Sequence, residues 1–201
     1  MTNNIKSLCV FCGSNSGASP IYSETTKLLA EMFVKNNITL VYGGAALGLM
    51  GDVANNVMAK GGKVIGVMPQ ALIDKEQAHT RLPEIHIVKT MHERKALMAD
   101  LSDGFILYPG GIGSLDEFFE IWTWSQLSIH NKPYGILNTH NYYDKLIEFL
   151  KHVANEKFVH SEHVEKLIIE QDANLLLEKF KNFIPLKVSK WLREERQNLI
   201  K

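Results

Sequence analysis

The sequence predicts a doubly wound α/β fold, in which helices cover both faces of one parallel sheet. Short apolar runs alternate with longer amphipathic segments along the whole chain. Several of the short runs consist almost entirely of Val, Ile, Leu, Tyr and Phe, which is typical of strands buried on both faces. Alternation of strands with crossover helices favours parallel pairing. Because the sequence shows no internal repeat and no Pro/Gly/Ser-rich linker, we expect a single domain over residues 1–185.

Strands and helices follow one another in a regular order. The sequence predicts strands at residues 7–12, 39–42, 63–68, 85–89, 104–108 and 134–138. It predicts amphipathic helices at residues 20–35, 47–60, 91–101, 114–128, 142–155 and 173–182, whereas the run at 167–171 fits either type. Residues 186–201 hold five Lys/Arg against two Glu and form a basic amphipathic tail, which we expect to be a solvated helix or a packing arm.

The composition excludes several classes of protein. The chain has 201 residues, with 22 Lys+Arg against 22 Asp+Glu. A protein that coats nucleic acid or an anionic membrane needs a basic surplus, so we expect neither partner. The two cysteines form no disulfide framework, and the start of the chain lacks the apolar run of roughly 7–15 residues found in secretory signals. We therefore expect a cytoplasmic protein.

Three glycine-rich turns follow predicted strands, at residues 12–20, 42–51 and 108–117. The first contains Gly13 and Ser14, and the second contains Gly43 and Gly44. Glycine lets backbone N–H groups approach an anion closely, and a helix N-terminus adds about half a positive charge, so a phosphate suits such turns best. Neither the G-x-G-x-x-G fingerprint nor the G-x-x-x-x-G-K-[ST] motif is present, which leaves a mononucleotide as the expected ligand.

Two charged residues stand out beside these turns. Arg94 lies on an otherwise apolar helical stripe with Met91, Met98 and Leu101, in a helix whose capping box runs from Thr90 to Glu93. A guanidinium there needs an anionic partner, which is either a salt-bridging side chain or a ligand phosphate.

Glu117 is the second charged residue, and it has two interpretations. It completes a Ser-x-x-Glu capping box with Ser114, which is a structural role. Alternatively, it faces the ligand that the preceding glycine turn holds.

The helix at 114–128 is apolar on both sides, through Leu115, Phe118 and Trp122 on one and Ile121, Trp124 and Leu127 on the other. One face can cover the sheet while the other meets a second subunit, so we expect a homodimer.

Other candidate sites are weaker. Cys9 and Cys12 form C-x-x-C, but their odd spacing in a strand sends the thiols to opposite faces, so we interpret them as structural. His160 and His163 lack a third ligand at suitable spacing, and we expect no metal site.

Several motifs in order resemble one enzyme family. These are CVFCGSNSG at 9–17, LVYGGAALGLMG at 40–51, MHERKALM at 91–98 and PGGIGSLDE at 109–117, and the likeness extends to about residue 185. The sequence is similar to the "Lonely guy" (LOG) family of cytokinin riboside 5′-monophosphate phosphoribohydrolases, formerly labelled possible lysine decarboxylases. Ser114 stands where the family signature PGGxGTxxE has Thr, and Ala45 and Ala46 replace residues of a loop usually richer in glycine.

The resemblance implies a Rossmann-like fold, a homodimer, and hydrolysis of a purine nucleoside 5′-monophosphate, with adenine or N6-prenyladenine as the base, to free base and ribose 5-phosphate. By motif match, Arg94 and Glu117 correspond to the catalytic pair. Glu76, Lys95 and Thr123 match positions that help hold the nucleotide. The residues that match the nucleotide-binding loop are Gly110, Gly111, Ile112, Gly113, Ser114, Leu115 and Asp116.

These observations lead to a mechanism without metal or organic cofactor. Cleavage of the C1′–N9 bond passes through an oxocarbenium-like state, which a carboxylate near C1′ stabilises. We assign this role to Glu117, and we expect Arg94 to anchor the nucleotide. The glycine loop, helped by Gly13 and Ser14, would hold the 5′-phosphate. The alternative is a non-catalytic carrier of a nucleotide or pterin monophosphate. A lysine decarboxylase would instead need pyridoxal phosphate as a Schiff base.

Overall fold

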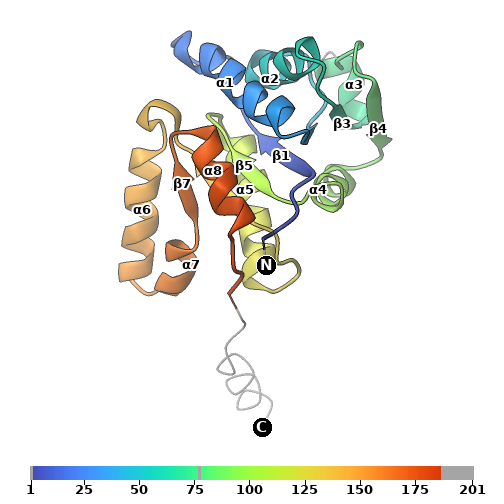
Figure 1. Cartoon of the computed structure of the whole chain (residues 1–201). Coiled ribbons are helices and arrows are strands. Elements are labelled where there is room, and N and C mark those ends of the chain that lie inside the picture. The colour runs from blue at the N-terminus through green and yellow to red at the C-terminus, as the bar shows by residue number, and fades with distance from the viewer. Residues whose placement is uncertain (1, 77, 187–201) are drawn as a thin grey trace.

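The fold is one seven-stranded sheet, all parallel, with helices on both faces (Figure 1). A computed structural model describes residues 2–76 and 78–186. The strands follow the order β4-β3-β2-β1-β5-β6-β7 across the sheet. Their bounds are β1 Ser7–Phe11, β2 Thr39–Tyr42, β3 Val64–Pro69, β4 Glu84–Val88, β5 Phe105–Leu107, β6 Tyr134–Leu137 and β7 Ile168–Glu170.

Two hydrophobic clusters bind the helices to the sheet, one on each face. Side chains of α1, α2 and α8 pack in the first cluster, and side chains of α4, α5 and α6 pack in the second. The helices are α1 Ile21–Lys35, α2 Gly48–Ala59, α3 Gln70–Glu76, α4 Met91–Asp100, α5 Ile112–Gln126, α6 Asp144–Asn155, α7 Ser161–Glu165 and α8 Ala173–Lys181. The predicted doubly wound α/β fold is therefore confirmed.

The chain reverses its direction of travel across the sheet at β1. Strands β2, β3 and β4 lie on one side of β1, and β5, β6 and β7 lie on the other. Strand β1 pairs with β5 through Cys9 opposite Phe105 and Phe11 opposite Leu107. In open α/β sheets, ligands bind beyond the carboxyl ends of the strands at such a switch point. The turns after β1 and β5 leave the sheet at this place.

The differences from the predicted elements concern short segments. The structure adds α3 and α7, of seven and five residues, which are too short to show helical periodicity in sequence. The ambiguous run at 167–171 contains strand β7. Helix α6 begins at Asp144, two residues later than predicted, because a 3₁₀ turn (Thr139–Asn141) precedes it. Of the predicted tail, residues 187–201 lie outside the described part.

The two cysteines lie on opposite faces of β1, as their spacing predicts. Cys9 packs in the cluster with α5, and Cys12 packs in the cluster with α1 and α2. Both are free thiols. Among the described helices, none has the length and apolar character needed to cross a bilayer.

Candidate functional site

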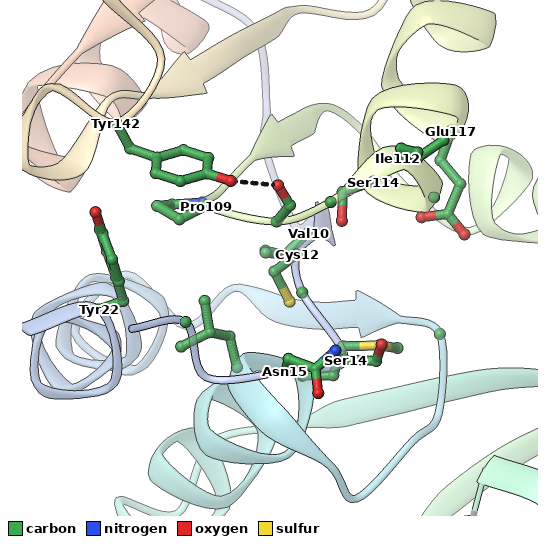
Figure 2. A pocket seen from close by; sticks show the side chains of 18 of the residues that line it. Val10, Cys12, Ser14, Asn15, Tyr22, Pro109, Ile112, Ser114, Glu117 and Tyr142 are labelled. Atoms are coloured by element: carbon green, nitrogen blue, oxygen red, sulfur yellow. Dashed lines mark hydrogen bonds between the residues drawn. The ribbon is translucent and has the colours of Figure 1, made fainter. Parts of the chain in front are cut away.

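A cavity of about 620 Å³ opens at the switch point between β1 and β5. Figure 2 shows the turn after β1 on one side of it and the turn after β5 on the other, with Tyr22 and Tyr142 at one end and Glu117 at the opposite end. Ten of the predicted residues line it, namely Gly13, Ser14, Gly43, Arg94, Gly110, Gly111, Ile112, Gly113, Ser114 and Glu117. The three glycine-rich turns thus converge on one site.

Close backbone contacts hold these turns together. The N–H of Gly13 donates to the carbonyl of Pro109 at 3.0 Å, and the N–H of Met50 donates to the carbonyl of Gly13 at 3.1 Å. At Gly48, which has φ of +55°, a Cβ atom would stand 2.4 Å from the backbone carbon of Ser14. Only glycine permits that approach, so α2 begins directly against the turn after β1.

The cavity receives the N-terminus of α5. Gly111 is the N-cap, in extended conformation, and the helix starts at Ile112. The first N–H groups of a helix have no intrahelical acceptor and carry the positive end of its dipole. The predicted cap at Ser114 is wrong, because Ser114 lies inside the first turn and Gly111 takes the cap position. Glu117 is therefore not needed as a capping residue.

Arg94 has the salt-bridging partner that its position on α4 suggested, together with two backbone carbonyls. Its Nε donates to the carbonyl of Val67 at 3.1 Å, and its Nη2 donates to the carbonyl of Gly43 at 3.0 Å. Its Nη1 stands 3.6 Å from Oε1 of Glu117, and the side chains are only 7% and 13% exposed. Since both also line the cavity, a buried ion pair faces the ligand space. The predicted N-cap of α4 is confirmed, because the N–H of Glu93 donates to Oγ1 of Thr90. The carboxylate of Glu93 accepts from the N–H of Lys89, one residue before the cap.

The guanidinium of Arg94 occupies the space that a side chain at position 43 would need. A Cβ atom at Gly43 would stand 1.9 Å from Nη2 of Arg94 and 2.5 Å from Cε of Met50. The second glycine turn therefore leaves room for a guanidinium.

Lys95 and Asp116 do not line the cavity but pair with each other. The ammonium of Lys95 lies 3.3 Å from Oδ2 of Asp116 and 3.0 Å from Oε2 of Glu120, which joins α4 to α5. Burial works to lower the pKa of Lys95, but the hydrogen bonds and charges of Glu120 and Asp116 outweigh it and raise that pKa. This lysine acts here as a bridge between two helices.

Three other predicted residues also fall away from the lining, namely Thr123, Leu115 and Gly44. Thr123 is exposed on α5, and its hydroxyl donates to the carbonyl of Phe119 one turn earlier. Leu115, on α5, is partly buried and packs against the second hydrophobic cluster. Gly44 has φ of +81° and makes the turn itself. The side chain of Glu76 lies outside the described part of the structure.

Sequence reasoning missed several lining residues, among them Asn15, Tyr22, Met50 and Tyr142. Asn15 falls within a turn that the glycines had already marked. Tyr142 follows β6, and the strand order needed to place it beside the turn after β5 is not readable from local sequence.

Cys12 also lines the cavity, without the properties of a nucleophile. Burial raises the pKa of its thiol far above the usual range, and the charge of Glu117 adds to that rise. A thiol kept protonated is a poor nucleophile. Among described residues, no group of three or more His, Cys, Asp or Glu is arranged to hold a metal ion.

Comparison with known proteins identifies the family. A family model described as possible lysine decarboxylase matches residues 50–180. A cytokinin riboside 5′-monophosphate phosphoribohydrolase of Rhodococcoides fascians is 43% identical over 168 residues, covering 83% of this chain and 85% of the relative. The chain belongs to the LOG family. LOG2 of Arabidopsis thaliana, which carries the same enzyme name, is 39% identical over 183 residues and covers 91% of this chain and 86% of its own.

Solved structures of other proteins share the fold of this chain. A molybdenum cofactor binding protein of Rippkaea orientalis superposes with a TM-score of 0.65 at 18% identity, covering 89% of this chain and 97% of that one. A molybdenum cofactor carrier protein of Chlamydomonas reinhardtii gives 0.64 at 16% identity, with coverages of 88% and 100%. At such identities the likeness concerns the fold alone.

The family description raises the question of pyridoxal phosphate. That cofactor needs a lysine amine for its Schiff base. Among the described residues that line the cavity, none is a lysine, and Lys95 is tied to Asp116 and Glu120. The described residues of the cavity therefore do not fit pyridoxal phosphate.

Proposed function

We propose that this LOG-family protein is a hydrolase that cleaves the N-glycosidic bond of a purine nucleoside 5′-monophosphate, releasing the free base and ribose 5-phosphate. The observation that carries the proposal is the placement of Glu117. It lies on α5 just beyond the helix N-terminus, faces the same cavity, and is held beside the buried guanidinium of Arg94. An anion site and a carboxylate on one helix suit a ligand with a phosphate at one end and a reacting carbon further along.

The start of α5 would hold the phosphate. The N–H groups at Gly111, Ile112 and Gly113 belong to the unsatisfied set that opens a helix, and Gly13 borders them from β1. Phosphate binding remote from the reacting bond positions that bond for the chemistry.

Glu117 would act at the anomeric carbon. As the C1′–N9 bond breaks, its electron pair leaves with the base, which takes up a proton, and positive charge grows on the sugar. The carboxylate of Glu117 stabilises that charge and accepts a proton from the water that adds to C1′. Arg94 keeps the carboxylate in place through the ion pair and is itself fixed by the carbonyls of Gly43 and Val67.

The relatives are named for a cytokinin riboside 5′-monophosphate. For this chain we propose an adenine ribotide, either AMP or its N6-prenylated form, as the substrate. We also propose a homodimer. Leu127 and Ile129 at the end of α5 are 60% and 63% exposed, and Thr123 lies on the exposed side of the same helix. An apolar surface of this kind favours contact with a second subunit.

Incubation with a panel of nucleoside 5′-monophosphates, with and without an isopentenyl group, tests the proposal. Chromatography should detect free purine base from a monophosphate and much less from the matching nucleoside. Equal release from both would contradict the assignment of the phosphate site. Binding of AMP without any release of adenine would instead support a carrier.

A further inference from the structure

We propose that Tyr142 is a positioning residue, whose hydroxyl orients the Gly110–Gly111 peptide so that its N–H can serve the phosphate. The inference rests on the proposed function of the cavity. Tyr142 follows β6 and lines the cavity at the end opposite Glu117, and Figure 2 shows its side chain next to the turn that contains Pro109. The hydroxyl of Tyr142 donates a hydrogen bond of 2.8 Å to the carbonyl of Gly110.

The phosphate turn needs a restraint from outside itself. Gly110 and Gly111 are consecutive, and glycine has the largest conformational freedom of any residue. A Cβ atom placed at Gly111 or Gly113 would meet nothing within 4 Å. Packing therefore does not fix Gly111 or Gly113, whereas Gly110 lies close against Ser114 and Gly13. The orientation of the Gly110–Gly111 peptide must then be set by its hydrogen bonds.

Three successive carbonyls of the turn accept hydrogen bonds from other segments. The hydroxyl of Tyr143 donates to Tyr108 at 3.0 Å, the N–H of Gly13 donates to Pro109 at 3.0 Å, and the hydroxyl of Tyr142 donates to Gly110 at 2.8 Å. A peptide unit is planar and trans, so a fixed carbonyl also fixes the N–H on its opposite side. Tyr142 thereby sets the direction of the N–H of Gly111, a residue that lines the cavity.

The segment that carries Tyr142 is itself built to be rigid. His140 and Asn141 both have positive φ, 50° and 60°, although neither is glycine. Such strained conformations persist only where the surroundings enforce them, and they gather at functional sites. Gln171 donates to the side chain of Asn141 at 2.6 Å, and the rings of Tyr22 and Tyr142 pack in a T-shaped arrangement with centroids 5.5 Å apart.

Tyr143 provides a matched control for Tyr142. Its hydroxyl makes the same kind of bond to the same turn, but the peptide unit that it fixes ends in Pro109, which has no N–H to offer a ligand. Tyr143 is also 4% exposed, whereas Tyr142 is 43% exposed. Loss of the buried hydroxyl should therefore affect stability, and loss of the exposed one should affect phosphate binding.

The experiment compares Tyr142→Phe and Tyr143→Phe in the full chain. Calorimetry gives Kd for AMP, inorganic phosphate and adenosine, thermal unfolding gives Tm, and base release gives KM and kcat. For Tyr142→Phe we expect Kd for AMP and phosphate, and KM, to rise about tenfold, the effect of one hydrogen bond to a charged group. Its Tm, its kcat and its affinity for adenosine should stay at the wild-type values. Tyr143→Phe should lower Tm and leave the affinity for phosphate unchanged.

Three results would overturn the role of Tyr142. The first is wild-type phosphate affinity in Tyr142→Phe. The second is a phosphate affinity that falls in both variants in proportion to their loss of Tm. The third is an affinity for adenosine that falls in Tyr142→Phe as much as the affinity for AMP. The binding measurements do not need turnover. If phosphate affinity depends on Tyr142 but the protein releases no base, only the proposed hydrolysis is rejected. If the protein hydrolyses the substrate but its phosphate affinity does not depend on Tyr142, only the positioning role is rejected.

Discussion

Replacement of Gly43 by alanine tests whether the turn after β2 holds Arg94 in its working position. The new methyl carbon would stand 1.9 Å from Nη2 of Arg94 and 2.5 Å from Cε of Met50, so both side-chain ends must move. A long side chain can swing its tip aside at small steric cost. Here, however, the tip is bound, because Nη2 donates to the carbonyl of Gly43 and Nη1 pairs with Glu117.

The magnitude follows from those contacts. A hydrogen bond to a charged group contributes about 1.5–3 kcal/mol, so Gly43→Ala should lower the free energy of unfolding by about 2 kcal/mol. A displacement of about 1 Å in a catalytic group can cost a hundredfold in rate, and kcat for base release should fall by about that factor. Urea denaturation and a steady-state assay measure the two effects.

Gly61→Ala is the control for the general cost of a glycine replacement. Gly61 has φ of +76°, but a Cβ atom there would meet nothing within 4 Å. Gly61→Ala should lower the free energy of unfolding by about 1 kcal/mol through backbone strain and leave kcat unchanged. A Gly43→Ala protein with wild-type kcat would refute the idea that this glycine positions Arg94.

Three further outcomes are expected. Burial lowers the pKa of His130 and the charge of Lys132 adds to this, although the Ile121 carbonyl opposes it. The fold therefore favours the neutral ring, and the free energy of unfolding should decline as pH falls below about 6.5, less steeply in His130→Gln. Cys12 should react with a thiol reagent at pH 8 far more slowly than after unfolding, because burial keeps it protonated; equal rates would contradict this. Gly110→Ala should abolish phosphate binding measured by calorimetry, since its Cβ would stand 2.8 Å from the backbone nitrogen of Gly13.

The local features of the site were predictable from sequence, and the long-range ones were not. Glycine-rich turns are recognisable from a few consecutive residues, and Arg94 is recognisable because its charge interrupts an apolar helical stripe. Glu117 had two interpretations until the structure placed the N-cap at Gly111. That assignment depends on backbone angles, which the Ser-x-x-Glu pattern does not determine.

Other features depend on which strands become neighbours. Tyr142 reaches Gly110 because β6 lies next to β5 in the sheet. The two residues are 32 positions apart in the sequence. Lys95 bridges to Asp116 and Glu120 because α4 and α5 share one face of the sheet. The family resemblance implies a nucleotide-holding role for Lys95, which stays a prediction, while the packing of the two helices places its ammonium beside two carboxylates.

The rate of adenine release from AMP by Glu117→Gln, compared with Glu120→Gln, tests the central claim most directly. Both replacements remove one negative charge from α5, but Glu120 pairs with Lys95 and does not line the cavity. Glu117→Gln should bind AMP with Kd within about threefold of the wild type and lose on the order of 10²–10⁴-fold in kcat, while Glu120→Gln keeps its rate. Full turnover by a folded Glu117→Gln protein would contradict the assignment of this carboxylate to the anomeric carbon.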